Sequence, residues 1–127
     1  MLILLLVDDD EMSRELIRMR LTRLGYTVIT AIDGREGIEA AREETPNLIL
    51  MDLCMPGMDG FEAAQKLKAD NATAHIPIVA LSALNTSVAV RRAIKAGCDS
   101  FHTKPVNLTS LHIKIRRLVL NSEGAPG

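Results

Sequence analysis

Two unbroken apolar runs, each ending in acidic side chains, most constrain how this chain of 127 residues can fold. Residues 2–7 lead directly into three aspartates at positions 8–10, and residues 48–51 lead into Asp52. An apolar run of this kind, bounded by turn residues, is typical of a strand buried on both faces. A carboxylate that follows such a strand lies at the rim where open α/β sheets bind their ligands. The two runs therefore predict a parallel sheet with an acidic rim.

The rest of the chain alternates between strand and helix patterns. The predicted strands cover residues 2–7, 26–31, 47–52, 76–81 and 99–103, and the predicted helices cover residues 11–24, 34–44, 60–69, 87–96 and 107–120. The first helix is expected to bury Ile17, Leu21 and Leu24, with Gly25 ending it. Segment 26–31 is less uniformly apolar, which suits an edge strand. Five strand–helix units predict a parallel sheet covered by helices on both sides.

Length and composition predict one domain over residues 1–120 and a flexible tail over residues 121–127. No apolar run approaches the roughly 18–20 residues of a membrane span. The two isolated cysteines, Cys54 and Cys98, do not form a disulfide framework, and a reducing cytoplasm fits them best.

The overall charge of −1 hides an uneven distribution along the chain. Residues 1–62 carry 6 basic and 13 acidic side chains, whereas residues 63–127 carry 9 and 3. Two solvated faces of opposite sign would explain this, and so would an acidic metal rim together with a basic partner surface. The basic residues are not interleaved with aromatics, so neither interpretation predicts nucleic-acid binding.

Chemically active side chains follow four of the predicted strands at the same end. They are Asp8 and Asp9, Asp52, Ser82 and Lys104. Several carboxylates delivered to one rim repel each other unless a cation bridges them. Carboxylates bind Mg²⁺, an ammonium neutralises a phosphoryl oxygen, and a hydroxyl donates a hydrogen bond to another. The set predicts Asp52 as a nucleophile that forms an acyl phosphate.

The same residues resemble the receiver domain of bacterial two-component response regulators over residues 2–120. The resemblance rests on four segments that occur in this order, each at a predicted strand end: Leu6-Val7-Asp8-Asp9-Asp10, then Leu48-Ile49-Leu50-Met51-Asp52 with Met55-Pro56 and Met58-Asp59-Gly60, then Val79-Ala80-Leu81-Ser82-Ala83, and Lys104-Pro105. It implies a flavodoxin-like three-layer α/β/α sandwich with five helices and a five-stranded parallel sheet in the order 2-1-3-4-5. It also implies a phosphoacceptor signalling domain that assists its own phosphorylation and dephosphorylation rather than an enzyme.

The resemblance assigns a role to each matching position. Asp52 would accept the phosphoryl group from a phosphohistidine of a sensor histidine kinase or a histidine phosphotransfer protein. Asp9, Asp52 and the backbone carbonyl of Cys54 would bind Mg²⁺, which Mn²⁺ could replace, and Asp8 would act through a bound water. Ser82 and Lys104 would contact the phosphoryl group.

The resemblance further implies a switch and an output surface. The Lys104–Pro105 peptide bond would be cis, and Phe101 would be an aromatic switch coupled to Ser82. The surface of helices 87–96 and 107–120 with strand 99–103 would then bind a downstream effector or kinase. That surface is expected to be basic through Arg91, Arg92, Lys95, Lys114, Arg116 and Arg117.

Other interpretations fit the residues less well. Aspartyl phosphatases of the haloacid-dehalogenase type need a second aspartate two residues after the nucleophile, where this chain has Cys54. A flavin carrier needs a hydroxyl-rich phosphate loop and aromatics, whereas this chain has acids after its first strand and 2% aromatic residues. A docking-only receiver would not need an intact Asp52. Asp10 and Asp59 are interpreted as helix-start residues. Whether the chain is a stand-alone receiver or part of a larger regulator stays open.

Overall fold

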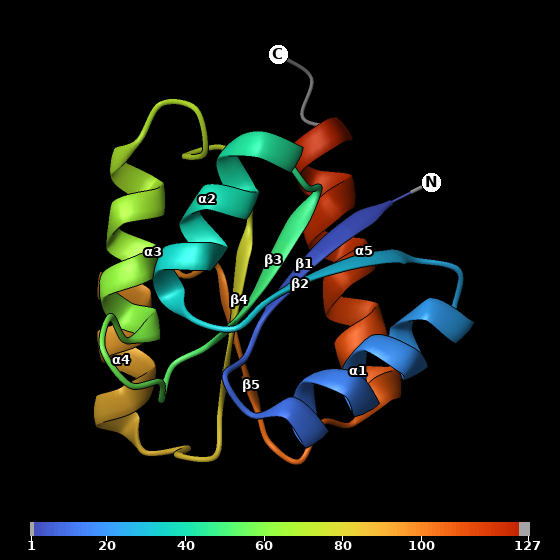
Figure 1. Ribbon diagram of the computed structural model, residues 1–127, viewed down its shortest axis with the longest axis horizontal. Helices are drawn as coiled ribbons and strands as arrows, with labels where there is room; N and C mark the ends of the chain where they lie inside the picture. The colour runs from blue at the N-terminus through green and yellow to red at the C-terminus, as the bar shows by residue number, and fades with distance from the viewer. Residues whose placement is uncertain (1, 125–127) are drawn as a thin grey trace.

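The structure, a computed structural model, describes the backbone of residues 2–124 and the side chains of residues 2–121. Five parallel strands form one sheet in the order β2-β1-β3-β4-β5 (Figure 1). They are β1 (Ile3–Val7), β2 (Thr27–Ala31), β3 (Leu48–Asp52), β4 (Ile78–Ser82) and β5 (Ser100–Thr103). The expected strand order is therefore confirmed, with the less apolar β2 at one edge.

Five helices alternate with the strands: α1 (Glu11–Arg23), α2 (Gly34–Glu44), α3 (Gly60–Ala69), α4 (Ser87–Lys95) and α5 (Leu108–Gly124). Asp10 and Asp59 cap α1 and α3, accepting hydrogen bonds from the backbone N–H groups of Ser13 and Glu62, as interpreted from the sequence. Most boundaries lie within two residues of the prediction, but two differences go further. Helix α5 extends to Gly124, so residues 121–124 of the expected tail are helical, and residues 125–127 lie outside the described part.

The second difference concerns the end of α1. Leu24 was expected to be buried, but it is 44% exposed. It is the C-cap residue, and the following Gly25 has the positive φ of 99° typical of a helix end. Leu24 is therefore an exposed residue at the end of α1 and not part of its buried stripe.

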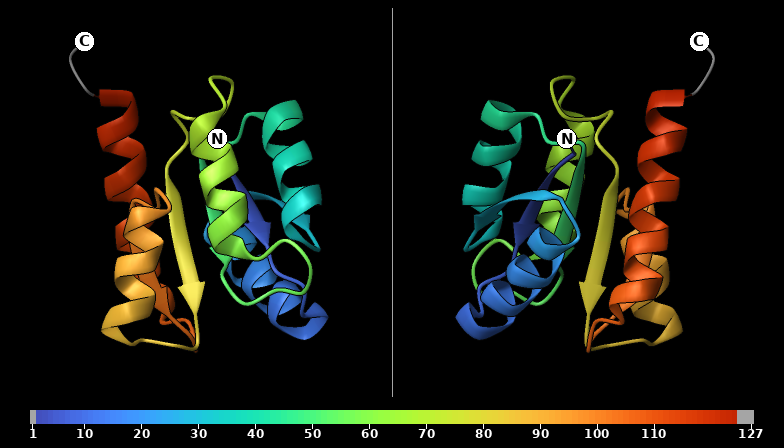
Figure 2. Two further views of the ribbon diagram at one scale, coloured as in Figure 1. Left: turned by 90° about the vertical axis from the view of Figure 1, so that its left-hand side faces the viewer. Right: turned by 90° about the vertical axis from the view of Figure 1, so that its right-hand side faces the viewer.

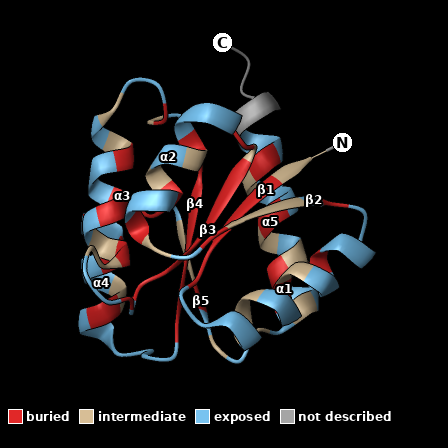
Figure 3. Cartoon of the chain, in the orientation of Figure 1, coloured by how far each residue is buried: buried red, intermediate tan, exposed pale blue. Residues whose placement is uncertain are grey.

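Two aliphatic cores flank the sheet, one on each face. Alternate residues of β1 enter different cores: Leu5 and Val7 pack with residues of α2, α3 and α4, whereas Leu4 and Leu6 pack with residues of α1 and α5. Figure 3 shows the buried residues concentrated on the strands and on the inward sides of the helices. The result is the expected flavodoxin-like three-layer sandwich, in which both faces of the sheet are covered.

The parallel register brings the carboxyl ends of the strands to one rim. Figure 2 shows the strand arrows pointing away from the end of the molecule where α5 terminates. Val7 pairs with Met51, and Asp52 pairs with Leu81, so Asp8 and Asp52 follow neighbouring strands at the same level. Gly60 at the start of α3 is required here, because a Cβ atom at this position would collide with the carbonyl oxygen of Asp52.

Among residues 2–124, no helix combines the length and the apolar composition needed to cross a membrane.

Candidate functional site

The rim holds the acidic cluster that the sequence predicts. One carboxylate oxygen each from Asp8, Asp9 and Asp52 lies within 4.8 Å of the others. Asp8 is fully buried and Asp52 is 6% exposed, whereas Asp9 is open to solvent. Clustered carboxylate oxygens are the donors that Mg²⁺ and Mn²⁺ prefer, and an exposed member leaves space for the waters that Mg²⁺ retains. The donor set therefore fits the expected divalent cation.

Lys104 reaches this cluster from the loop after β5. Its Nζ donates to Asp8 Oδ2 at 3.0 Å and to Asp52 Oδ2 at 3.4 Å. A third contact runs to the hydroxyl of Ser13 at 3.2 Å. The following Lys104–Pro105 peptide bond is cis, as expected. The structure thus brings together residues that are 44 to 96 positions apart in the chain, namely Asp8, Asp52 and Lys104.

The two buried carboxylates differ in their ionisation. Burial raises the pKa of Asp52 to about 6, and the neighbouring charge of Asp8 adds to this, whereas the Cys54 N–H and the Lys104 ammonium oppose it. Burial also acts on Asp8, but hydrogen bonds from the Asp10 N–H and from Lys104 outweigh it, so the pKa of Asp8 lies below its ordinary value. The site therefore keeps Asp8 ionised and makes Asp52 easier to protonate. A bound cation would displace that proton from Asp52.

Lys104 stays cationic in this environment. Burial alone would lower the pKa of its ammonium, but the hydrogen bond to Asp8 and the charge of Asp52 raise it above its ordinary value. A permanent cation beside Asp52 can neutralise negative charge that arrives there.

Ser82 and Cys54 occupy the remaining predicted positions. The Ser82 hydroxyl is buried at the end of β4 and accepts a hydrogen bond from the Leu84 N–H at 2.9 Å. A hydroxyl can donate its own proton at the same time. The N–H of Cys54 donates to Asp52 Oδ1 at 3.1 Å, and its side chain is exposed. Its carbonyl as a metal ligand stays a prediction.

Phe101 lies on β5, which β4 separates from the strand β3 that ends in Asp52. It is half-buried on β5 and packs against the core that contains Leu5 and Val7. Its carbonyl accepts a hydrogen bond of 2.7 Å from Lys114 of α5, whose Nζ also lies 3.2 Å from His102 Nδ1. Strand β5 is therefore tied to α5 by a side chain as well as by packing.

The expected basic surface is more divided than the sequence indicates. The Arg92 guanidinium lies 4.0 Å from the centre of the Phe61 ring and 3.8 Å from Asp59, so it faces α3. Arg116 lines a hollow with Tyr26 and His112 instead. Helices α4 and α5 also expose apolar side chains, namely Val88, Ile94, Ile113 and Leu120. This surface therefore combines basic and apolar groups.

Two contributors were not identified from the sequence. Ser13 contacts Lys104, and Arg14 donates from Nη1 to the Asp8 carbonyl at 3.0 Å. Both stand in the first turn of α1, which begins directly after the acidic run. A helix that starts at the rim must place its first turn beside the rim, and this is the signal that could have indicated them.

Known proteins match this chain over a range that includes all of these site residues. The profile of the family described as the response regulator receiver domain matches residues 4–116. The transcriptional regulatory protein AfsQ1 of Streptomyces coelicolor is 36% identical over 120 residues, covering 94% of this chain and 52% of that protein. The response regulator PleD of Caulobacter vibrioides is 39% identical over 115 residues, covering 91% of this chain and 25% of that protein. The chain thus spans about half the length, or less, of these relatives.

A solved structure agrees with the fold. The receiver domain of the sensor histidine kinase PA1611 from Pseudomonas aeruginosa superposes with a TM-score of 0.87 at 28% identity, covering 93% of this chain and 97% of that one. That crystal structure has a magnesium ion coordinated in its active-site cleft.

Proposed function

Because this chain belongs to the family of response regulator receiver domains, we propose that Asp52 accepts a phosphoryl group from the phosphohistidine of a sensor kinase or phosphotransfer protein. The reaction takes place in the cytoplasm and needs Mg²⁺. The observation that carries this proposal is the contact of Lys104 with both Asp8 and Asp52 inside a cluster of three carboxylates. A nucleophile, a cation for the transferred charge and a set of metal ligands are the parts that phosphoryl transfer needs.

The residues divide the work as follows. A carboxylate oxygen of Asp52 attacks phosphorus while the phosphorus–nitrogen bond to the donor histidine breaks. Lys104 and the hydroxyl of Ser82 stabilise the phosphoryl oxygens. Asp9, Asp52 and the Cys54 carbonyl would hold Mg²⁺ directly, with Asp8 acting through water. The metal, when bound, neutralises the carboxylates and the phosphoryl group.

Incubation with acetyl phosphate and Mg²⁺ tests the proposal. The intact mass of the protein should increase by one phosphoryl group, which hydroxylamine should remove because it cleaves acyl phosphates. Omitting the metal by adding EDTA should suppress the gain. An unchanged mass with Mg²⁺ present would contradict the proposed function.

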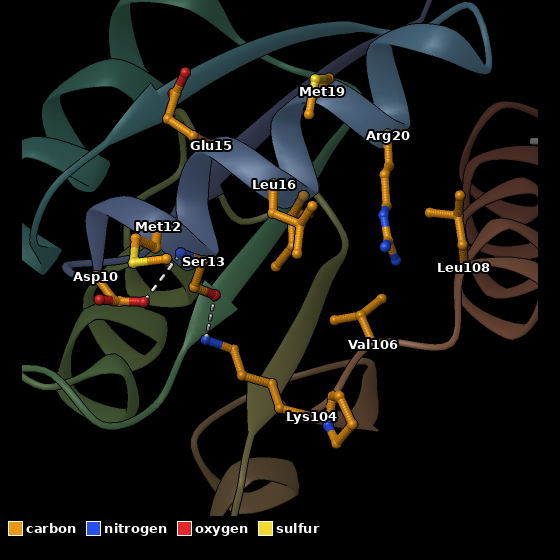
Figure 4. A pocket seen from close by; sticks show the side chains of 12 residues that line it. Asp10, Met12, Ser13, Glu15, Leu16, Met19, Arg20, Lys104, Val106 and Leu108 are labelled. Atoms are coloured by element: carbon orange, nitrogen blue, oxygen red, sulfur yellow. Dashed lines mark hydrogen bonds between the residues drawn. The ribbon is translucent and has the colours of Figure 1, made fainter.

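The donor protein needs a surface beside the acceptor, and a groove extends from it. The groove has a volume of about 620 Å³ and lies between α1 and the segment that follows β5 (Figure 4). Ser13 and Lys104 line it, so it is continuous with the acceptor site. Met12, Leu16 and Met19 expose apolar side chains there, with exposed fractions of 83%, 46% and 42%. We propose that it takes the apolar helical surface around the donor histidine.

A Leu16→Asp variant should separate this docking from the chemistry. Placing a charge against an apolar partner surface should slow phosphotransfer from a protein donor by about tenfold, as expected for an interface anchor. Phosphorylation by acetyl phosphate, which needs no docking, should stay within about twofold of wild type. The matched control is Leu24→Asp. Leu24 caps the end of the same helix and is similarly exposed, at 44%, but it lies outside the groove lining. Equal slowing by both variants would contradict the proposed docking surface.

We further propose that phosphorylation alters the surface formed by α4, β5 and α5. Drawing the Ser82 hydroxyl toward the phosphoryl group would free space that the Phe101 ring can fill, and burial of the apolar ring would favour its inward position. The bonds from Lys114 to β5 then offer a route by which a movement of Phe101 reaches α5.

Amide NMR shifts test this switch. Adding beryllofluoride and Mg²⁺ should shift amides at the rim and also amides of β5 and the adjoining parts of α4 and α5. In a Ser82→Ala variant, the rim shifts should remain while the distant shifts should largely disappear. Distant shifts of equal size in both proteins, or wild-type shifts confined to the rim, would contradict the switch.

A further inference from the structure

The hydroxyl of Ser13 contacts the ammonium group that the proposed reaction depends on. Ser13 lies in the first turn of α1, and its Oγ is 3.2 Å from Lys104 Nζ across 91 positions of the chain (Figure 4). The place of Ser13 is fixed by its backbone, because its N–H donates to the capping carboxylate of Asp10 at 2.9 Å. The side-chain hydroxyl is therefore not needed for the helix cap.

The three acceptors around Lys104 differ in charge. A lysine ammonium has three N–H donors, and here they have three partners: Asp8 Oδ2 at 3.0 Å, Ser13 Oγ at 3.2 Å and Asp52 Oδ2 at 3.4 Å. Both carboxylates change their surroundings when a cation binds or when Asp52 is phosphorylated. Ser13 is the neutral partner and stays the same in each state.

We propose that Ser13 is a positioning residue for Lys104, holding the ammonium on the α1 side of the acceptor while Asp8 and Asp52 exchange it for metal and phosphoryl oxygens. This inference rests on the proposed phosphoacceptor function. The hydrogen bond to Ser13 fixes one N–H of the ammonium in every state. The other two N–H groups then point toward the place where the phosphoryl oxygens arrive. Fewer lysine orientations then have to be lost as the phosphoryl group is transferred.

A Ser13→Ala variant removes this contact with little structural disturbance. The backbone cap remains, and alanine has a higher helix propensity than serine, so the unfolding midpoint should not fall. The maximal rate of phosphorylation at saturating acetyl phosphate should drop roughly fivefold, which is within the usual effect of losing one hydrogen bond. The apparent Mg²⁺ affinity and the acetyl phosphate concentration at half-maximal rate should stay within about twofold. Ser13→Thr keeps the hydroxyl and should restore the rate.

The control variant is Ser110→Ala. Ser110 has the same position in α5, because its N–H donates to the side chain of Asn107 at 3.0 Å, and it is exposed. Its replacement should leave the rate unchanged, so a loss in Ser13→Ala alone would not be a general effect of removing a serine from the first turn of a helix.

A double-mutant cycle decides whether Ser13 acts through Lys104. In a Lys104→Ala background, Ser13→Ala should cause no further loss of rate. A full fivefold loss in that background would overturn the inference. If that background is too slow to measure, the unfolding midpoints of the metal-free single and double variants should be non-additive, and additive midpoints would overturn it.

The outcomes also separate this inference from the proposed function. Wild-type protein without a phosphoryl group on Asp52 would contradict the function itself. Normal wild-type labelling together with an unchanged rate in Ser13→Ala would contradict only the role of Ser13.

Discussion

An Asp52→Asn variant should gain no phosphoryl group from acetyl phosphate and Mg²⁺ under conditions in which the wild-type protein is fully labelled. The side-chain amide is a poor nucleophile, and it also removes one negative charge from the cluster of Asp8, Asp9 and Asp52. We therefore expect complete loss of labelling by intact mass rather than a reduced rate.

The other rim carboxylates should not replace Asp52. Asp8 is fully buried, so a phosphodonor cannot reach its carboxylate, which also accepts hydrogen bonds from the Asp10 N–H and from Lys104. Labelling that persists in Asp52→Asn, or that moves to Asp8 or Asp9 in fragment spectra, would contradict the assignment of the acceptor.

The matched control for this experiment is Asp59→Asn. Asp59 lies in the same loop region and caps α3 through the Glu62 N–H, and asparagine caps helices equally well. This variant removes one carboxylate near the rim without touching the cluster, so its labelling should equal that of wild type.

The rim could be predicted from the sequence because strand ends are encoded locally. Each apolar run fixes one strand, and Asp8, Asp52, Ser82 and Lys104 each follow or end a strand. Parallel strands deliver these positions to one edge whatever the details of packing. The strand boundaries were accurate within two residues for the same reason.

Features that depend on contacts between elements were not predicted. The hydroxyl of Ser13 becomes relevant only because α1 passes beside the loop that carries Lys104. In the same way, helical periodicity shows that Arg92 leaves the core but not that its guanidinium stacks on Phe61. The end of α5 was placed too early because residues 121–124 resemble a linker in composition, although the chain continues the helix there.

The raised pKa of Asp52 leads to a prediction for the metal-free protein. Its pKa of about 6 in the folded protein lies above the ordinary value of 3.8, so the folded state binds this proton more tightly than the unfolded state. The contribution of Asp52 to the free energy of unfolding is therefore greatest when it is protonated. That contribution should be lost as the pH rises from about 4 to about 6 and should stay lost above that pH.

Asp52→Asn should therefore stabilise the metal-free protein at neutral pH, because it removes the charge that burial and Asp8 disfavour. The full shift corresponds to roughly 1–3 kcal/mol. The difference in free energy of unfolding between variant and wild type should grow by about 1–2 kcal/mol between pH 4.5 and pH 7.5. Denaturant unfolding in EDTA at both pH values measures it.

Mg²⁺ and a second substitution complete this test. Asp59 is half-buried and lies outside the cluster of Asp8, Asp9 and Asp52, so Asp59→Asn is the matched control for the loss of a carboxylate in these measurements. Adding Mg²⁺ at pH 7.5 should stabilise wild type more than Asp52→Asn, because the carboxylate charges that repel each other in the metal-free wild type attract the cation. A less stable Asp52→Asn at pH 7.5, or a difference that does not change with pH, would show that Asp52 is not held at the cost of folding. The expected result, a wild type less stable than Asp52→Asn, would instead mean that the buried charge is retained beside Asp8 for its chemistry, since a site selected for stability alone would place an apolar or amide side chain there.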